Sequence, residues 1–305
     1  MQYPRHISYN EAMKKNTRTL FIILVVLGIC CLAAAGGILL YRHQRDRQSQ
    51  ETLEALRASA ENYLPAETPG TPPPSPVPPG SEPDGSQAQS TPEPTATPEP
   101  TPEPVENPYQ DSFLANEDMA AWLVVPDTRI DYPVMWTPRD ENYYLRRNFE
   151  GKDDQNGCLI LDTDSRVDPM TTNLIIHGHN MKSGAMFGDL EKYKDESYFQ
   201  EHREMLLHTE EGLHTYEVIA VFRSQVYKKT DQVFKFYQFF QADTQEEFDD
   251  FYNNIMELSL YDTGVTAEYG DRFLTLSTCS YHVDRGRFVV VARETGCETS
   301  YAPFR

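Results

Sequence analysis

The pattern of hydrophobic and polar positions divides the chain into distinct parts. Residues 20–41 form a run of 22 residues without a charged side chain, and about 20 apolar residues are enough for a helix to cross a bilayer. A polar segment and a proline-rich tract come next. From residue 109 onward, short apolar stretches alternate with turn residues. The pattern therefore predicts a membrane helix, a connecting region and one globular domain.

The globular part predicts a mostly β fold with a few short helices. Its apolar runs are rich in Val, Ile, Leu and aromatic residues and are bounded by Gly, Asp or Pro, which is typical of strands. Thr244 and Glu247 form a capping box, and apolar residues at helical spacing follow it, which predicts one helix. A β-barrel and a β-sandwich both fit. The expected strands are Ala121–Val125, Ile130–Met135, Cys158–Leu161, Asn173–His177, His214–Phe222, Phe273–Ser277 and Arg287–Arg293.

The apolar run is interpreted as a retained anchor. A cleaved signal peptide is the alternative, because Ala33–Ala35 resembles a cleavage site, but the run continues through Leu40. A lipoprotein signal around Cys30 is disfavoured by the bulky Ile29 before it. Four basic residues precede the run and four follow it, so the positive-inside rule does not decide the orientation. The absence of Lys and Arg between Arg57 and Arg129 favours translocation of the segment after the run.

The connecting region is dominated by proline. Of 22 prolines, 16 fall between Pro65 and Pro108, and such a tract cannot build a hydrogen-bonded core. It predicts a disordered linker. In the alternative interpretation it is a semi-rigid spacer in polyproline II conformation, which would span on the order of 130 Å and lift a domain off a membrane. The expected organisation is a cytoplasmic tail (1–19), a transmembrane helix (20–41), a polar stalk (42–64), the linker (65–108) and a globular domain (109–305).

Charge and cysteine content exclude several classes of protein. The chain has 27 basic and 47 acidic residues, a net charge of −20, which argues against a nucleic-acid-binding protein. Five cysteines in 305 residues do not make a disulfide scaffold. Outside the apolar run remain Cys158, Cys279 and Cys297, so at least one thiol stays unpaired.

Cys279 is the candidate nucleophile. It follows an alternating strand that ends in Ser and Thr, and a nearby cation can hold such a thiol as thiolate. Arg287 lies eight residues further on, so a hairpin would place it beside Cys279, where it can stabilise an oxyanion. Arg285 and Arg293 are the competing arginines. The alternative for Cys279 itself is a buried structural cysteine.

His179 is the candidate general acid. It follows the turn Gly178 at the end of an apolar strand, a position from which a histidine can protonate a leaving amine. His177 lies on the same face of that strand, so a zinc site is a second interpretation. No further doublet of His or Cys completes a ligand set, and we expect no metal and no cofactor. Hydrogen-bonded packing is the alternative for both, and His282 is a weaker candidate base.

Several motifs, taken together and in order, resemble the sortase family and are most similar to its class B group. The combination of TLSTC with a nearby Arg and an upstream GHN is highly specific. The motifs span nearly all of residues 121–293 and comprise Trp122–Val134, Asn142–Leu145, Gly157–Asp162, Asn173–Leu190 with its GHNM and MFGDL pieces, Thr275–Cys279 and Arg287–Val290.

The resemblance implies a closed β-barrel of about eight strands, with the helix from Thr244 as the additional helix of class B members. It places the family's catalytic roles on Cys279 (nucleophile), His179 (general acid and base) and Arg287 (oxyanion and substrate stabilisation). Ser277, Thr278 and Asn180 are expected to bind substrate. The sequence departs from its relatives at two positions: His177 stands where they usually have Tyr, and Cys158 where they have a plain apolar residue.

The resemblance also implies a function. Sortases are membrane-anchored cysteine transpeptidases of Gram-positive cell surfaces, which orients the N-terminus to the cytoplasm and the domain to the outside. The implied partners are surface proteins with a C-terminal sorting signal, cleaved after Thr, and a peptidoglycan amine as acceptor. Calcium dependence is not expected. The alternatives are a non-catalytic, membrane-tethered scaffold or adhesion module and a zinc-dependent hydrolase that uses His177 and His179.

Overall fold

A computed structural model describes residues 9–61 and 105–304 of the chain. Eight strands close into a barrel in the order β1-β2-β3-β4-β7-β8-β6-β5. The β2–β3 and β4–β7 pairs are parallel. A barrel rather than a sandwich is therefore confirmed. The helices and strands are α1 (Tyr9–Glu61), α2 (Gln110–Ala115), β1 (Met119–Val124), β2 (Asp131–Met135), η1 (Tyr143–Arg146), β3 (Leu159–Leu161), β4 (Asn173–Gly178), η2 (Leu190–Lys194), α3 (Glu196–Glu201), β5 (Glu204–His208), β6 (Gly212–Gln225), η3 (Phe236–Gln238), α4 (Gln245–Leu258), β7 (Phe273–Cys279) and β8 (Gly286–Ser300).

All seven strands expected from the sequence are present, and one further strand was missed. β5 consists of five residues that begin with an exposed Glu204, so it gives only a weak apolar signal. It forms because β1 and β6 pair with it on either side. β6 and β8 are also longer than their apolar runs, because they pair with each other along their whole length. Gly212 pairs with Ser300 at one end of this ladder, and Gln225 pairs with Gly286 at the other.

The strands alternate between the interior of the barrel and an outer layer under the helices. Inward side chains such as Leu174, Leu276 and Val290 belong to the main core. Outward side chains of β7 and β8, among them Phe273 and Val291, pack under α4. Thr244 caps that helix with the predicted capping box. Burying a Phe-sized side chain contributes about 1.5–3 kcal/mol, so this packing fixes α4 on the outer face of the barrel.

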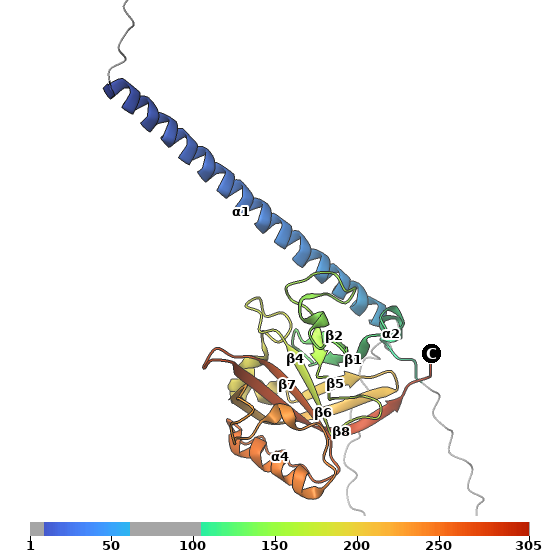
Figure 1. Cartoon of the computed structure of the whole chain (residues 1–305). Coiled ribbons are helices and arrows are strands. Elements are labelled where there is room, and N and C mark those ends of the chain that lie inside the picture. The colour runs from blue at the N-terminus through green and yellow to red at the C-terminus, as the bar shows by residue number, and fades with distance from the viewer. Residues whose placement is uncertain (1–8, 62–104, 305) are drawn as a thin grey trace, which may run out of the picture.

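The apolar run and the polar stalk form one continuous helix, α1, of 53 residues. It is the one helix among the described residues that is long and apolar enough to cross a membrane. Figure 1 shows α1 extending away from the barrel, with only its C-terminal part beside α2. A third buried cluster, around Trp122 and Phe113, lies there.

The proline-rich tract, apart from its last residues, lies outside the described residues. Val105 already forms a parallel bridge with Tyr301, and the buried Asn107 side chain donates a 2.9 Å hydrogen bond to the Thr209 carbonyl. Contacts with the barrel thus begin ahead of the boundary expected at Tyr109.

Stability should fall in mild acid because of His208. This side chain is buried, its Nδ1 lies 2.7 Å from the Tyr301 hydroxyl, and burial together with the nearby His214 lowers its pKa from 6.5 to about 4. The unfolded chain takes up this proton near pH 6.5, so the stabilisation is complete above that pH and is lost as the pH falls towards 4. We expect the free energy of unfolding to drop by up to about 3 kcal/mol across that window.

The measurement is thermal unfolding of the full chain in detergent at pH 7 and pH 4.5, followed by the fluorescence of Trp122 and Trp136. These are the two tryptophans of the chain. His208→Gln should flatten the pH dependence. An equally steep dependence in the variant would contradict the assignment to His208.

Candidate active site

Cys279 and Arg287 face each other across a hairpin. They are directly paired residues at the ends of β7 and β8, as the sequence predicted. The backbone N–H of Ser280 closes the turn with a 2.9 Å hydrogen bond to the carbonyl of Gly286. A side chain at Gly286 would lie 2.3 Å from the Ser280 carbonyl, so glycine is required there. The hairpin thus fixes a thiol and a guanidinium on the same face of the sheet.

His179 reaches the same end of the barrel from the neighbouring strand. Gly178 of β4 pairs with Thr278 of β7, so His179 and Cys279 each come directly after a paired position. A Cβ at Gly178 would lie 2.6 Å from the Phe187 ring. Glycine therefore lets β4 pack closely there.

The orientation of His179 is set by a backbone carbonyl. Its Nε2 lies 2.8 Å from the carbonyl oxygen of Leu145. Because a carbonyl only accepts, Nε2 carries the hydrogen, and Nδ1 is left as the nitrogen that can take up or release a proton. Leu145 follows β2 in the chain, and spacing alone did not point to its contact with His179.

Backbone carbonyls also hold the guanidinium of Arg287. Its Nη1 donates to the carbonyls of Gly286, at 3.1 Å, and Arg285, at 3.5 Å. The competing Arg293 is six positions away along β8 and lies 3.6 Å from Asp271. Arg285 contributes its carbonyl to this arrangement.

One cavity of about 470 Å³ brings the three predicted residues Cys279, His179 and Arg287 together. Arg293 and His282 do not line it, and Nδ1 of His282 lies 3.1 Å from the Ser280 hydroxyl. The remaining lining residues are Glu141, Asn142, Leu145, Cys158, Ile160, Asp162, His177, Gly178, Val226, Phe236, Tyr237, Ser277 and Thr278.

The three residues expected to bind substrate differ in their surroundings. Ser277 lines the cavity, and its buried hydroxyl has no hydrogen-bond partner among the described residues. Thr278 also lines it, but its hydroxyl donates a 2.8 Å hydrogen bond to the Gly178 carbonyl. Asn180 lies outside the lining, and its amide donates a 2.8 Å hydrogen bond to the Cys279 carbonyl. Of these three residues, Ser277 is thus the one that lines the cavity and has a side chain without a hydrogen-bond partner among the described residues.

His177 pairs with a carboxylate that was not singled out from the sequence. Its Nε2 lies 3.1 Å from Oδ2 of Asp162, and both line the cavity. The sequence signals for Asp162 were its place directly after the apolar run of β3 and its position at the end of the Gly157–Asp162 motif, and neither of them pointed to His177. No group of three or more His, Cys, Asp or Glu side chains suited to a metal ion occurs within 9–61 and 105–304.

The two cysteines that line the cavity differ in exposure. Cys279 is exposed and Cys158 is buried. Burial raises the pKa of the Cys158 thiol, and the nearby Asp154 adds to this effect. Cys158 packs in the cluster around Trp122, and its Sγ lies 3.5 Å from the Arg147 carbonyl, to which the thiol can donate. A neutral, buried thiol is a poor nucleophile, so Cys279 remains the candidate nucleophile of the two.

Comparison with known proteins gives a consistent result. The model of the sortase domain matches residues 123–295. Sortase B of Listeria monocytogenes is 36% identical over 177 residues, which cover 57% of this chain and 69% of that protein. Sortase B of Staphylococcus aureus is 26% identical over 183 residues, covering 58% and 70%.

Solved structures agree with this result. Sortase B of Bacillus anthracis has a TM-score of 0.53 at 34% identity, with 61% of this chain and 83% of that chain covered. For sortase B of Clostridium perfringens the TM-score is 0.55 at 26% identity, with 61% and 99% covered.

Proposed function

The chain belongs to the sortase family, in its class B group of cysteine transpeptidases, and from this premise we propose that it cleaves a C-terminal sorting signal after Thr and joins the surface protein to a peptidoglycan amine. The observation that carries the proposal is the single cavity shared by Cys279, His179 and Arg287. Thiol, imidazole and guanidinium are the nucleophile, proton carrier and oxyanion partner that acyl transfer needs.

In the first half-reaction, the thiolate of Cys279 attacks the carbonyl carbon of Thr. Arg287 stabilises the negative charge that develops on the oxygen. The C–N bond then breaks, and protonated His179 gives its proton to the departing amine. A thioester between Cys279 and the Thr acyl group remains.

In the second half-reaction, the acceptor amine attacks the thioester carbon. The C–S bond breaks and regenerates the thiolate, while His179 takes up the proton from the amine. Ser277, which lines the cavity, contacts the peptide, whereas Thr278 and Asn180 hold the strand ends in place. Neither half-reaction uses a metal or a cofactor.

The proposed setting is the outer face of the cell membrane. Residues 20–41 of α1 form the single span, with residues 1–19 in the cytoplasm and the barrel of residues 109–305 outside. The length and apolar character of the helix support this arrangement, and the lack of basic residues between Arg57 and Arg129 supports translocation of the barrel.

The test is intact-mass measurement of the full chain in detergent after incubation with a panel of sorting-signal peptides, beside Cys279→Ala. A mass gain equal to the acyl part of one peptide, absent in the variant, would support the proposal and identify the motif. A folded chain that gains no mass with any peptide of a panel covering the Thr-containing signals would favour a non-catalytic scaffold instead.

A further inference from the structure

The C-terminal part of α1 lies against the barrel rather than free of it. Ser49, Leu53, Leu56 and Ala60 repeat at helical spacing and share one face. Ser49 is 7% exposed and Ala60 3% exposed. Leu53 packs against the main core and Leu56 against the cluster around Trp122. This part of α1 therefore has an apolar docking face although its composition is polar.

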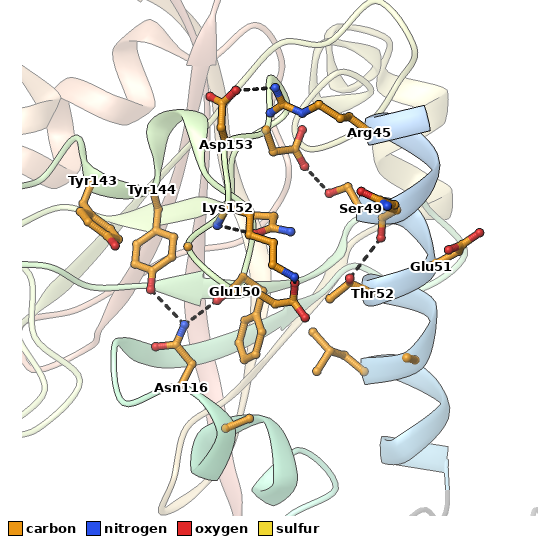
Figure 2. Close-up of a pocket in the computed structure, with 18 residues that line it drawn as sticks. Arg45, Ser49, Glu51, Thr52, Asn116, Tyr143, Tyr144, Glu150, Lys152 and Asp153 are labelled. Carbon is orange, nitrogen blue, oxygen red and sulfur yellow. Dashed lines mark hydrogen bonds and ion pairs between the residues drawn. The ribbon is translucent and has the colours of Figure 1, made fainter. Parts of the chain in front are cut away.

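Charged contacts fix the same face at both ends. Arg45 forms an ion pair with Asp153, and the Ser49 hydroxyl donates to the carboxylate of Asp154, as Figure 2 shows in part. Further along, Arg57 lies 2.9 Å from the Asp131 carboxylate. Its guanidinium also lies 5.2 Å from the centroid of the Tyr132 ring.

The helix contacts the chain segment that forms one wall of the active site. This segment, residues 141–158, connects β2 to β3 and is named the β2–β3 segment. On one side of the β2–β3 segment, Asp153 and Asp154 bind α1. On the other side, Glu141 and Leu145 line the catalytic cavity. The Leu145 carbonyl is the hydrogen-bond partner of Nε2 of His179.

Short backbone contacts join these two sides. The N–H of Asp154 donates a 2.9 Å hydrogen bond to the carbonyl of Arg146, the residue next to Leu145. The N–H of Cys158 donates a 3.1 Å hydrogen bond to the Tyr144 carbonyl. One hydrogen bond therefore joins Asp154 to the residue next to the carbonyl that orients His179.

The contact between α1 and the β2–β3 segment is not closely packed throughout. A cavity of about 970 Å³ lies between them around Glu51, Glu150 and Lys152 (Figure 2). The helix is thus attached at discrete points, and changes of charge at Arg45 and Ser49 should weaken the docking without disturbing the core of the barrel.

We propose that residues 45–60 of α1 are a positioning element of the active site: by docking on the β2–β3 segment they hold the Leu145 carbonyl, and through it His179, in the arrangement for proton transfer. This inference rests on the proposed transpeptidase function. The helix touches no reacting atom and acts on the turnover number through the β2–β3 segment.

The test compares two variants of the full chain in detergent with the same change in charge. Arg45→Asp with Ser49→Asp places carboxylates against acidic partners and should release the helix. Arg47→Asp with Gln44→Asp changes exposed positions of the same helix that line neither cavity between it and the barrel and is the control. Adding Asp153→Arg to the Arg45→Asp variant reverses one ion pair and should restore the contact.

Two readouts are measured: hydrogen–deuterium exchange of the β2–β3 segment, and kcat and KM with the peptide that acylates Cys279. The releasing variant should exchange faster in this segment and lose about 2- to 30-fold in kcat, with a smaller change in KM. The control variant should match the wild type in exchange and in kcat. The Arg45→Asp, Asp153→Arg variant should recover most of the kcat that Arg45→Asp alone loses.

Faster exchange with an unchanged kcat would overturn the positioning role, and unchanged exchange would overturn the docking itself. A wild-type chain that forms no thioacyl enzyme would instead refute the proposed function. In that case exchange alone decides whether the helix orders the β2–β3 segment.

Discussion

Replacing Cys279 by Ser is expected to abolish the thioacyl intermediate and lower the rate of transpeptidation by about 10³-fold or more. The hydroxyl has nearly the size of the thiol, so the hairpin with Arg287 stays intact. A serine hydroxyl is a far weaker nucleophile than a thiol unless a strong base activates it, so the proposed acylation step is lost. Because Cys279 is exposed, the loss should occur without a change in the melting temperature.

The matched control is Cys158→Ser. This thiol lines the same cavity but is buried and held neutral, so its replacement should leave the intermediate in place. Cys158→Ser should lower the melting temperature, whereas Cys279→Ser should not, because a hydroxyl replaces an apolar thiol in the cluster around Trp122. The intermediate is detected by intact mass. An acylated Cys279→Ser chain, or a Cys158→Ser chain that is not acylated, would contradict the assignment of the nucleophile.

Replacing Arg287 by Ala is expected to lower kcat/KM by about 10²-fold or more, the loss typical of one oxyanion donor. The guanidinium is fixed by the carbonyls of Gly286 and Arg285, so its charge is already in place when the tetrahedral oxygen forms. Arg287→Lys should recover only part of the rate, because an ammonium cannot reproduce the planar set of donors.

Arg293→Ala is the control for this second prediction. It removes the same charge from the same strand, but at the end that pairs with Phe273 and lies near Asp271. We expect a rate within about twofold of the wild type, since Arg293 does not line the catalytic cavity. A normal rate in Arg287→Ala together with a large loss in Arg293→Ala would transfer the role to Arg293.

Local signals in the sequence were sufficient for the barrel strands that carry apolar runs and for the capping box at Thr244. They were also sufficient for the Cys279–Arg287 pair, because a hairpin is a short-range structure whose register depends on the spacing. β5 could not be predicted, since its pairing with β1 and β6 depends on partners distant in the chain.

The supporting residues of the site lacked a local signal for the same reason. The Leu145 carbonyl meets His179 across 34 positions of sequence, and any residue type supplies a carbonyl. The contact between Ser49 and Asp154 spans 105 positions, and the polar stalk gave no sign that one of its faces would be buried. Contacts made by backbone groups or by ordinary polar side chains become visible only when the fold brings them together.

The docked helix also changes what the proline-rich tract can do. On its N-terminal side the tract follows α1, which ends at Glu61 and lies on the barrel, and near its C-terminal end Val105 bridges to Tyr301 of the barrel domain. From Tyr41, the end of the apolar run, to the buried Ser49, the rise along the helix is about 12 Å. If α1 is anchored in a membrane, the length of the helix between the membrane and the barrel sets the distance between the active site and the lipid. The contour length of the tract then does not increase this distance. Such an enzyme would work close to the lipid surface rather than at the distance that an extended tract could span.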